Sequence, residues 1–276
     1  MRRKLYLVNE IGSTFYFDYG HACVIEELDG FGFEFEIDYE AFDARFVETK
    51  RKIPQRSIDL TLDFLDGYHG FTRWREYLTR SKELRLFYET DAGKKYCYIN
   101  VKSSSKTQLE QGAIKTKVKI DCLSLWLVNK LAHIEVTDSG GGKIYTYDYP
   151  YVYAVSFNGK VRVTNDSPKD VPLLIRLHGN CYNPRVIIRQ NGADVQTLRL
   201  ITEERDEPII EISSDPTNQY IKLILGGEEI DYYNKQDFSC ENFLFLPPGE
   251  SEIFFDPGVR EEASCEIAFK EEYIAH

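Results

Sequence analysis

The feature that most constrains the fold is the alternation of apolar and polar residues along much of the chain. One such segment is FGFEFEIDYE, whose apolar positions would share one face of a strand: Phe31, Phe33, Phe35, Ile37 and Tyr39. SIDLTLDFL repeats the pattern with Ile58, Leu60, Leu62 and Phe64. A period of two held over this many residues predicts half-buried strands. The chain is therefore expected to be mainly β, in keeping with an aromatic content of 14%.

Between these two segments lies a stretch, AFDARFVETKRKIPQRS, that alternates poorly and has few apolar residues. We expect an extended arm here, over about residues 42–57, that folds against a neighbouring molecule. Its basic residues are candidate oligomer contacts: Lys50, Arg51, Lys52 and Arg56. The plausible partners on the neighbour are the acidic residues that alternate with the aromatic ones: Glu34, Glu36, Asp38 and Glu40. Opposite charges would set the register of such a contact.

One helix is expected among the strands, over about residues 68–81. Phe71, Trp74 and Leu78 recur there at helical spacing, and charged residues occupy the other positions. Asp91-Ala92-Gly93 then separates two strand patterns and predicts a hairpin. In IKTKVKIDC, which starts at Ile114, every second residue is again suited to a core.

A composition change in the middle of the chain predicts two domains. Residues 1–150 carry 22 basic and 23 acidic side chains, whereas residues 151–276 carry 12 and 22, so the net charges are −1 and −10. The glycine run Gly140–Gly142 lies at the change. We therefore expect a first domain at 1–140, a linker at 141–150 and a second domain at 151–276. About eleven short strand patterns separated by turn residues predict that the second domain is a β-sandwich of jelly-roll type.

Signatures of catalysis and of cofactor binding are missing from the sequence. The five histidines are scattered, and neither His21 with Cys23 nor His178 with Cys181 has a second pair at zinc-site spacing. The six cysteines form no C-x-x-C pair and suit buried positions with reduced thiols. Nucleophile-elbow, Walker and dinucleotide motifs do not occur. We expect no enzyme activity, no catalytic residues, no cofactor and no metal site, although two carboxylates placed across a cleft would escape this search.

Five tyrosines alternate across the predicted boundary: Tyr145, Tyr147, Tyr149, Tyr151 and Tyr153. A row of five on one face would fill an interface between the two domains or stack on sugar rings. Packing between domains is the preferred interpretation.

Two further segments resemble a known family. LRLFYETDAGKKYCYINVKSSSKTQLEQGAIKTKVKIDCLSLWL is similar to the N-terminal domain of siphophage distal tail proteins, in which a helix precedes a hairpin and a strand like CLSLWL follows. FLFLPPGESEIFFD is similar to a turn and strand near the end of their C-terminal sandwich. The order of strands, arm, helix, hairpin, linker and sandwich agrees with the family over nearly the whole chain.

The resemblance implies a structural protein of a phage or prophage tail. Its N-terminal domain would be a barrel-like or sandwich-like ring domain with one helix and an arm, and its C-terminal domain a galectin-like β-sandwich. The implied partners are other copies in a homohexamer that can stack as rings, the major tail tube protein, the tail-associated tip protein, and receptor-binding or other baseplate proteins. DNA would be met only in transit, so Glu34, Glu36, Asp38 and Glu40 are candidates for an acidic or neutral lumen.

The resemblance also implies a place in the virion, at the tip of the tail. The N-terminus lacks the apolar core of a signal peptide, and no apolar run is long enough to cross a bilayer, so we expect synthesis in the bacterial host cytoplasm and no membrane contact. The alternative function is a carbohydrate-binding β-sandwich that contacts host cell-wall sugars. Rings in solution would favour the structural tail protein, a hub to which other proteins attach. Glycan binding by residues 151–276 would favour the alternative.

Overall fold

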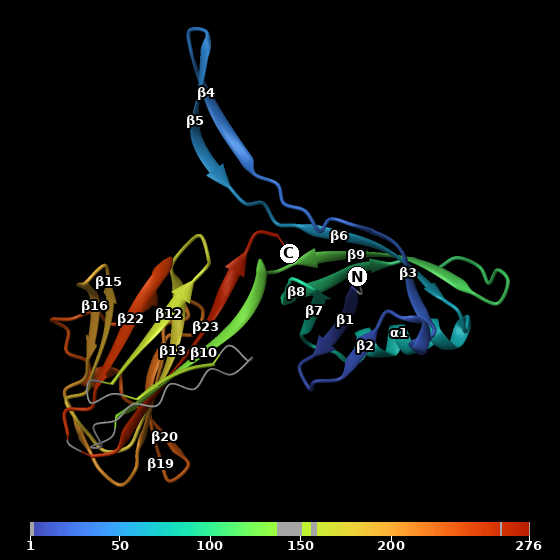
Figure 1. The fold of residues 1–276 in the computed structure, drawn as a ribbon. Coiled ribbons are helices and arrows are strands. Elements are labelled where there is room, and N and C mark those ends of the chain that lie inside the picture. Colours follow the sequence, from blue (N-terminus) through green and yellow to red (C-terminus); the bar gives the residue numbers. More distant parts are fainter. Residues whose placement is uncertain (1–2, 137–150, 156–158, 260, 276) are drawn as a thin grey trace. The chain divides into compact units, whose positions relative to one another are not determined.

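The computed structural model describes residues 3–136, 151–155, 159–259 and 261–275, with only the backbone of 151–155. It divides into two compact units, and each is described by itself (Figure 1). Unit 1 comprises residues 1–128 and 273–276, and unit 2 comprises residues 129–272. The chain passes from unit 1 to unit 2 inside strand β10 (Trp126–Val136) and returns at the end of β23 (Ala263–Tyr273).

This division differs from the one proposed from the sequence. The contact boundary falls at Val128, inside a strand, because β10 contributes side chains to both units. The predicted linker at 141–150 and the glycine run lie outside the described residues. The last residues, from Tyr273 onward, belong to unit 1 and not to the second domain. A change in charge composition can be read from the sequence. The sequence does not show, however, that one strand contributes side chains to two cores.

Unit 1 contains a seven-stranded antiparallel sheet in the order β2-β1-β7-β8-β9-β6-β3. The described residues contain one α-helix, which follows β6, and all other long elements are strands. The prediction of a mainly β chain is therefore confirmed. The elements are β1 (Lys4–Asn9), β2 (Thr14–Tyr16), a 3-10 turn η1 (Tyr19–His21), β3 (Cys23–Asp29), β4 (Glu36–Phe42), β5 (Arg45–Lys52), β6 (Ser57–Phe64), α1 (Tyr68–Arg80), β7 (Leu84–Thr90), β8 (Gly93–Ser104) and β9 (Ile114–Cys122).

The core of unit 1 follows the period-two pattern. Every second residue of β6, from Ile58 to Phe64, is at most 2% exposed, and the facing residues of β9 are buried beside them. α1 closes one side of this core with Trp74, which packs edge-on against Phe15 at 5.1 Å. The indole Nε1 of Trp74 donates to the hydroxyl of Ser104 at 3.0 Å, so the buried ring also satisfies its one polar atom.

One expectation about unit 1 is wrong. FGFEFEIDYE is not a half-buried strand, since its strand starts only at Glu36 and Phe33 and Tyr39 are each 58% exposed. Only Phe31 reaches the core, where it packs against Tyr88 and Trp126. The alternation correctly marks a strand with two unlike faces. It does not show that the apolar face has a partner within the same chain.

Unit 2 is built from two antiparallel sheets with a shared apolar core. One runs β10-β23-β13-β18-β19-β20, with β11 parallel to β10, and the other runs β12-β22-β15-β16. The elements after β10 are β11 (Tyr151–Val155), β12 (Lys160–Asn165), β13 (Val171–His178), β14 (Cys181–Tyr182), β15 (Arg185–Gln190), β16 (Ala193–Arg199), β17 (Glu203–Glu204), β18 (Ile209–Ser213), β19 (Tyr220–Leu225), β20 (Glu228–Asp231), a 3-10 turn η2 (Tyr233–Lys235), β21 (Phe245–Leu246), β22 (Gly249–Asp256) and β23.

The apolar segments predicted as strands in the second half are strands of unit 2. Their inward residues form one core cluster, with Ile175, Ile212, Val186 and Ile253 fully buried among them. The acidic run that begins at Glu203 contains the short strand β17, which pairs with β14.

The contribution of β10 to unit 2 can be tested with fragments. Ala132 and Ile134 of β10 are 2% and 0% exposed in the core of unit 2, and β10 lies between β11 and β23. We expect residues 129–272 to unfold cooperatively on heating. A fragment of residues 151–272 should be less stable by about 3–5 kcal/mol or fail to fold, because it loses buried side chains and a sheet neighbour. Differential scanning calorimetry of both fragments decides, and equal melting temperatures would refute the role of β10.

The stability of unit 2 should depend on pH through Glu211, which is nearly buried. Burial by itself raises the pKa of this carboxyl, but donation from the Tyr220 hydroxyl at 2.7 Å and from Arg176 Nε at 2.6 Å outweighs burial and lowers the pKa below its usual 4.5. Because the pKa of Glu211 is lower in the folded than in the unfolded protein, its carboxylate stabilises the fold at pH values above the unfolded pKa. This contribution is lost as the pH falls through the folded pKa.

Glu211→Gln should therefore lower the stability near neutral pH by about 2 kcal/mol and flatten its loss in acid. Melting temperatures between pH 3 and 7 measure both effects. Glu203→Gln is the control, because Glu203 meets Arg205 at an exposed site where an ion pair contributes little. A variant that loses stability as steeply as the wild type in acid would show that Glu211 is not the titrating group.

Candidate assembly surfaces

The first candidate surface is a β-hairpin formed by β4 and β5, called the arm here (Figure 1). The two strands pair with each other from Glu36–Lys52 to Phe42–Arg45, around a turn in which Asp43 has a φ of +51°. Ile37 is the only half-buried residue of either strand, and all the others are exposed. The arm therefore starts before the range predicted from the sequence, at Glu36, and its paired part ends at Lys52. A two-stranded hairpin without a core of its own is marginal in water.

The charges at the base of the arm are partly paired within it. Lys52 Nζ lies 2.5 Å from Glu36 Oε2, and Arg51 donates two bonds to Glu48 at 2.7 and 2.9 Å. These carboxylates raise the pKa of Lys52 and of Arg51, respectively. Lys50 faces Asp38 across the hairpin, but within the described residues neither side chain has an ion pair.

The far end of the arm is apolar on both faces. Phe46 is 76% exposed, and three neighbours are about half exposed: Tyr39, Phe42 and Val47. Soluble chains rarely leave several large apolar side chains together in water unless another molecule covers them.

Trp126 holds the base of the arm. Phe31, which precedes the arm, packs on the Trp126 ring at 5.5 Å, and the Arg56 guanidinium, which follows the arm, lies over the same ring at 4.8 Å. Arg56 Nε also donates to the Cys122 sulfur at 3.5 Å. A bond from the Cys97 thiol and the adjacent Arg56 charge together lower the pKa of Cys122, against the effect of burial. Arg56 is thus half-buried at the base, away from the other three predicted basic residues.

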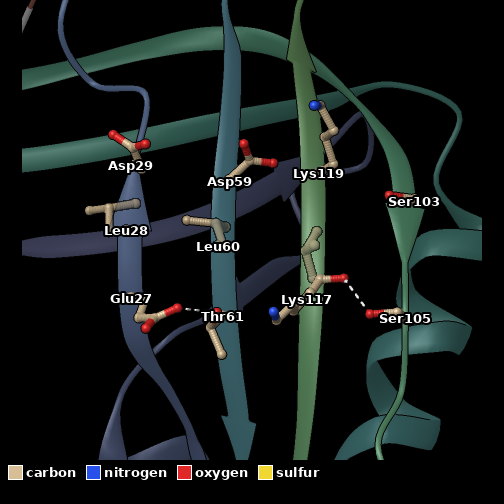
Figure 2. A pocket seen from close by; sticks show the side chains of 11 residues that line it. Glu27, Leu28, Asp29, Asp59, Leu60, Thr61, Ser103, Ser105, Lys117 and Lys119 are labelled. Atoms are coloured by element: carbon tan, nitrogen blue, oxygen red, sulfur yellow. Dashed lines mark hydrogen bonds between the residues drawn. The ribbon is translucent and has the colours of Figure 1, made fainter.

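The second candidate surface is a groove on the outer face of the unit 1 sheet (Figure 2). It lies over β3, β6 and β9, on the opposite side from the core. Figure 2 shows two rows of side chains that cross these strands: Asp29, Asp59 and Lys119 in one, and Glu27, Thr61 and Lys117 in the other. β3 thus gives an acidic column, β6 gives one aspartate and one threonine, and β9 gives a lysine column.

Few of the charges in the groove are neutralised. Thr61 donates to Glu27 at 3.0 Å. Within the described part of the chain, however, Asp29, Asp59, Lys117 and Lys119 have no ion pair, and all four are exposed. Asp29 and Asp59 are direct cross-strand neighbours, an arrangement that repels without a cation between them. The groove therefore carries charged side chains that have no ion pair, at positions fixed by the register of the strands.

The remaining predicted residues are placed as follows. Glu34 lies before β4, and Glu36, Asp38 and Glu40 lie in it, opposite Lys52, Lys50 and Val47 of β5, respectively. The groove was not predicted from the sequence. Its one signal was the lysines that alternate with the core residues of β9. The tyrosine row from 145 to 153 lies outside the residues whose side chains are described.

Exposed aromatic residues also occur in unit 2. Tyr233 and Phe238 are 43% and 62% exposed, with ring centroids 6.1 Å apart. Tyr232, by contrast, is buried, and its hydroxyl bonds to Thr202 and Glu204.

Thiols and possible metal ligands can be placed as well. Five of the six cysteines are buried, Cys240 is partly exposed, and none forms a disulfide. Burial raises the pKa of Cys23 to about 12 and that of Cys181 to about 11, so both stay protonated. Within the described ranges no three His, Cys, Asp or Glu residues gather as metal ligands would. No helix in those ranges is both long and apolar enough to cross a membrane.

Comparison with known proteins gives one family and several similar folds. Residues 4–123 match the family described as the distal tail protein, N-terminal domain. A chain of the phage P2 baseplate, in its activated conformation with calcium, has a TM-score of 0.67 at 14% identity over 100% of both chains. The SPP1 distal tail protein, described as a hub adsorption apparatus of phages that infect Gram-positive bacteria, has a TM-score of 0.64 at 12% identity. That match covers 98% of this chain and 99% of the other. No curated protein matches the sequence.

Proposed function

We propose, from the membership of residues 4–123 in the distal tail protein N-terminal domain family, that this chain is a structural hub of a phage baseplate. The match covers the sheet of unit 1, the helix and the whole arm. The likeness of the fold to chains of the P2 baseplate and to the SPP1 hub supports the same role. The role is one of assembly, without catalysis.

The hub is a homohexameric ring at the distal end of the tail tube, and unit 1 forms the ring. The observation that carries this proposal is the arm, a hairpin with nearly every residue exposed and an apolar end that its own chain leaves uncovered. Such a segment gains stability only when another molecule buries it. In a closed ring each copy gives one arm and receives one, so that all the arms are covered.

Unit 2 is the attachment point for receptor-binding or other baseplate proteins, and the ring joins the major tail tube protein to the tail-associated tip protein. Its own core supports this assignment, because a unit with a separate core can project from a ring and keep its fold. DNA would pass through the ring without being held. Basic residues that stand beside at least as many carboxylates, as in the groove and the arm, give little of the uniform positive field that holds a phosphate backbone.

The mass of the purified protein in solution tests the proposal. Light scattering should give six times the chain mass, and electron microscopy should show six-fold rings. A monomer at micromolar concentration that also fails to assemble at high concentration would refute the ring.

The exposed pair Tyr233 and Phe238 favours a second candidate, a carbohydrate-binding role for unit 2 against cell-wall sugars. Two exposed rings on one surface can stack on sugar faces. Glycan-array binding by the whole protein that disappears in Tyr233→Ser/Phe238→Ser would establish this role. If the array gives no signal, the carbohydrate-binding role is refuted and the structural hub is the one remaining candidate.

A further inference from the structure

The groove and the arm have charge patterns of matching dimensions. On the arm, Asp38 of β4 stands beside Lys50 of β5, and Glu36 stands beside Lys52 two residues away. In the groove, Asp59 of β6 stands beside Lys119 of β9. Both surfaces are pairs of adjacent antiparallel strands, so in each the acidic and basic columns are about 4.8 Å apart and successive rows about 7 Å apart.

We propose that the groove over β3, β6 and β9 receives the arm of a second copy of this chain. This inference rests on the proposed function and adds the surface on which the arm docks. Lys50 of one copy meets Asp29 and Asp59 of the next, and Asp38 meets the lysine column of β9. None of these residues has an ion pair within the described part of a single chain, and docking gives each of them a partner of opposite charge.

The charge pattern also sets the direction of the arm in the groove. Two sheets that stack face to face keep their strands roughly aligned, which leaves two opposite orientations for the hairpin. One orientation puts Lys50 above the aspartates and Asp38 above the lysines. The other puts like charges together, which is costly at an interface. Every arm in a ring would therefore dock in the same sense.

Two other occupants, a nucleic acid and the arm of the same chain, fit this charge pattern less well than the arm of a second copy. A nucleic acid would be attracted by Lys117 and Lys119 but repelled by the carboxylates of Glu27, Asp29 and Asp59 in the same rows. The arm of the same chain leaves both surfaces exposed, so it does not fill the groove. A second copy supplies both signs of charge at the right spacing.

Column swaps test the proposal without changing net charge. Asp38→Lys/Lys50→Glu reverses the arm, and Asp59→Lys/Lys119→Glu reverses the groove, while each keeps a cross-strand pair of opposite charges. Each swap alone should raise the dissociation constant of the ring about tenfold or more, and the two together should restore most of the affinity. The control swap is Arg189→Asp/Asp194→Arg in unit 2, which exchanges another cross-strand pair of opposite charges and should leave assembly unchanged.

Cross-linking of amines to carboxylates in rings mixed from light and heavy isotope-labelled copies gives a second measurement. Links from Lys50 to Asp59 or Asp29 should join a light to a heavy chain. Wild-type rings in which Lys50 links elsewhere, or in which the groove swap has no effect, would overturn this inference and leave the hub intact. A wild-type protein that never assembles would overturn both. A groove swap that abolishes DNA binding and leaves assembly unchanged would assign the groove to a polyanion and also overturn the proposal.

Discussion

Replacing Tyr39 and Phe46 by serine is expected to turn the rings into monomers and leave the fold of the monomer unchanged. Both side chains are on the apolar end of the arm, at 58% and 76% exposure, and touch no core. Burying a large side chain contributes about 1.5–3 kcal/mol, so the pair should weaken each contact by about 3–6 kcal/mol, or roughly a hundredfold to ten-thousandfold. Light scattering over a dilution series measures the shift, and circular dichroism verifies the fold.

Tyr233→Ser/Phe238→Ser is the matched control for this experiment. It removes one tyrosine and one phenylalanine of similar exposure from unit 2, and should leave the rings intact. If the arm variant forms rings at the same concentration as the wild type, the apolar end of the arm does not hold the ring together, and the proposal that the arm assembles it fails.

The parts of unit 1 that were predictable are those in which a strand's partner lies in the same core. The alternation in β6 assigns Ile58 and Phe64 to the inside, and the structure buries both. The spacing of Phe71, Trp74 and Leu78 likewise predicts α1, because a helix that packs on a sheet must show its apolar side at a period near 3.6. Local periodicity suffices in these cases because burial is decided within a few residues.

The arm and the groove were less predictable, since both depend on what a segment meets. The alternation from Phe31 to Tyr39 looks the same whether its apolar face is covered by its own sheet or by another molecule. The groove needs the register between distant strands, which places Asp59 beside Lys119 and Asp29 beside Asp59. Sequence gives each column of charge but not the order of the columns. Unlike the arm, whose basic residues attract attention as a cluster, the groove residues are spread over nearly a hundred positions.

Trp126→Ala is expected to destabilise unit 1 by about 3–5 kcal/mol, a large part of the total stability of an ordinary domain. The ring is fully buried, and its removal leaves a cavity between Phe31 and Tyr88. It also removes the surface under Arg56, whose buried Nη2 has no hydrogen-bond partner in the described residues. Urea unfolding followed by circular dichroism measures the loss, and Trp74 remains as a fluorescent reporter.

Trp74→Ala separates loss of core from loss of the arm's anchor. Trp74 is equally buried, but it lies on α1, and its ring packs against Phe15 and Phe17 rather than against the two residues at the base of the arm. Both alanine variants should lose stability. The milder pair Trp126→Phe and Trp74→Phe should stay folded, and only Trp126→Phe should free the arm, because Phe31 and Arg56 both rest on that ring. Trypsin should then cut at Lys50, Arg51 and Lys52 faster, and the rings should dissociate at higher concentrations. Equal cleavage and equal assembly in the two phenylalanine variants would show that Trp126 supports the core of unit 1 without holding the arm.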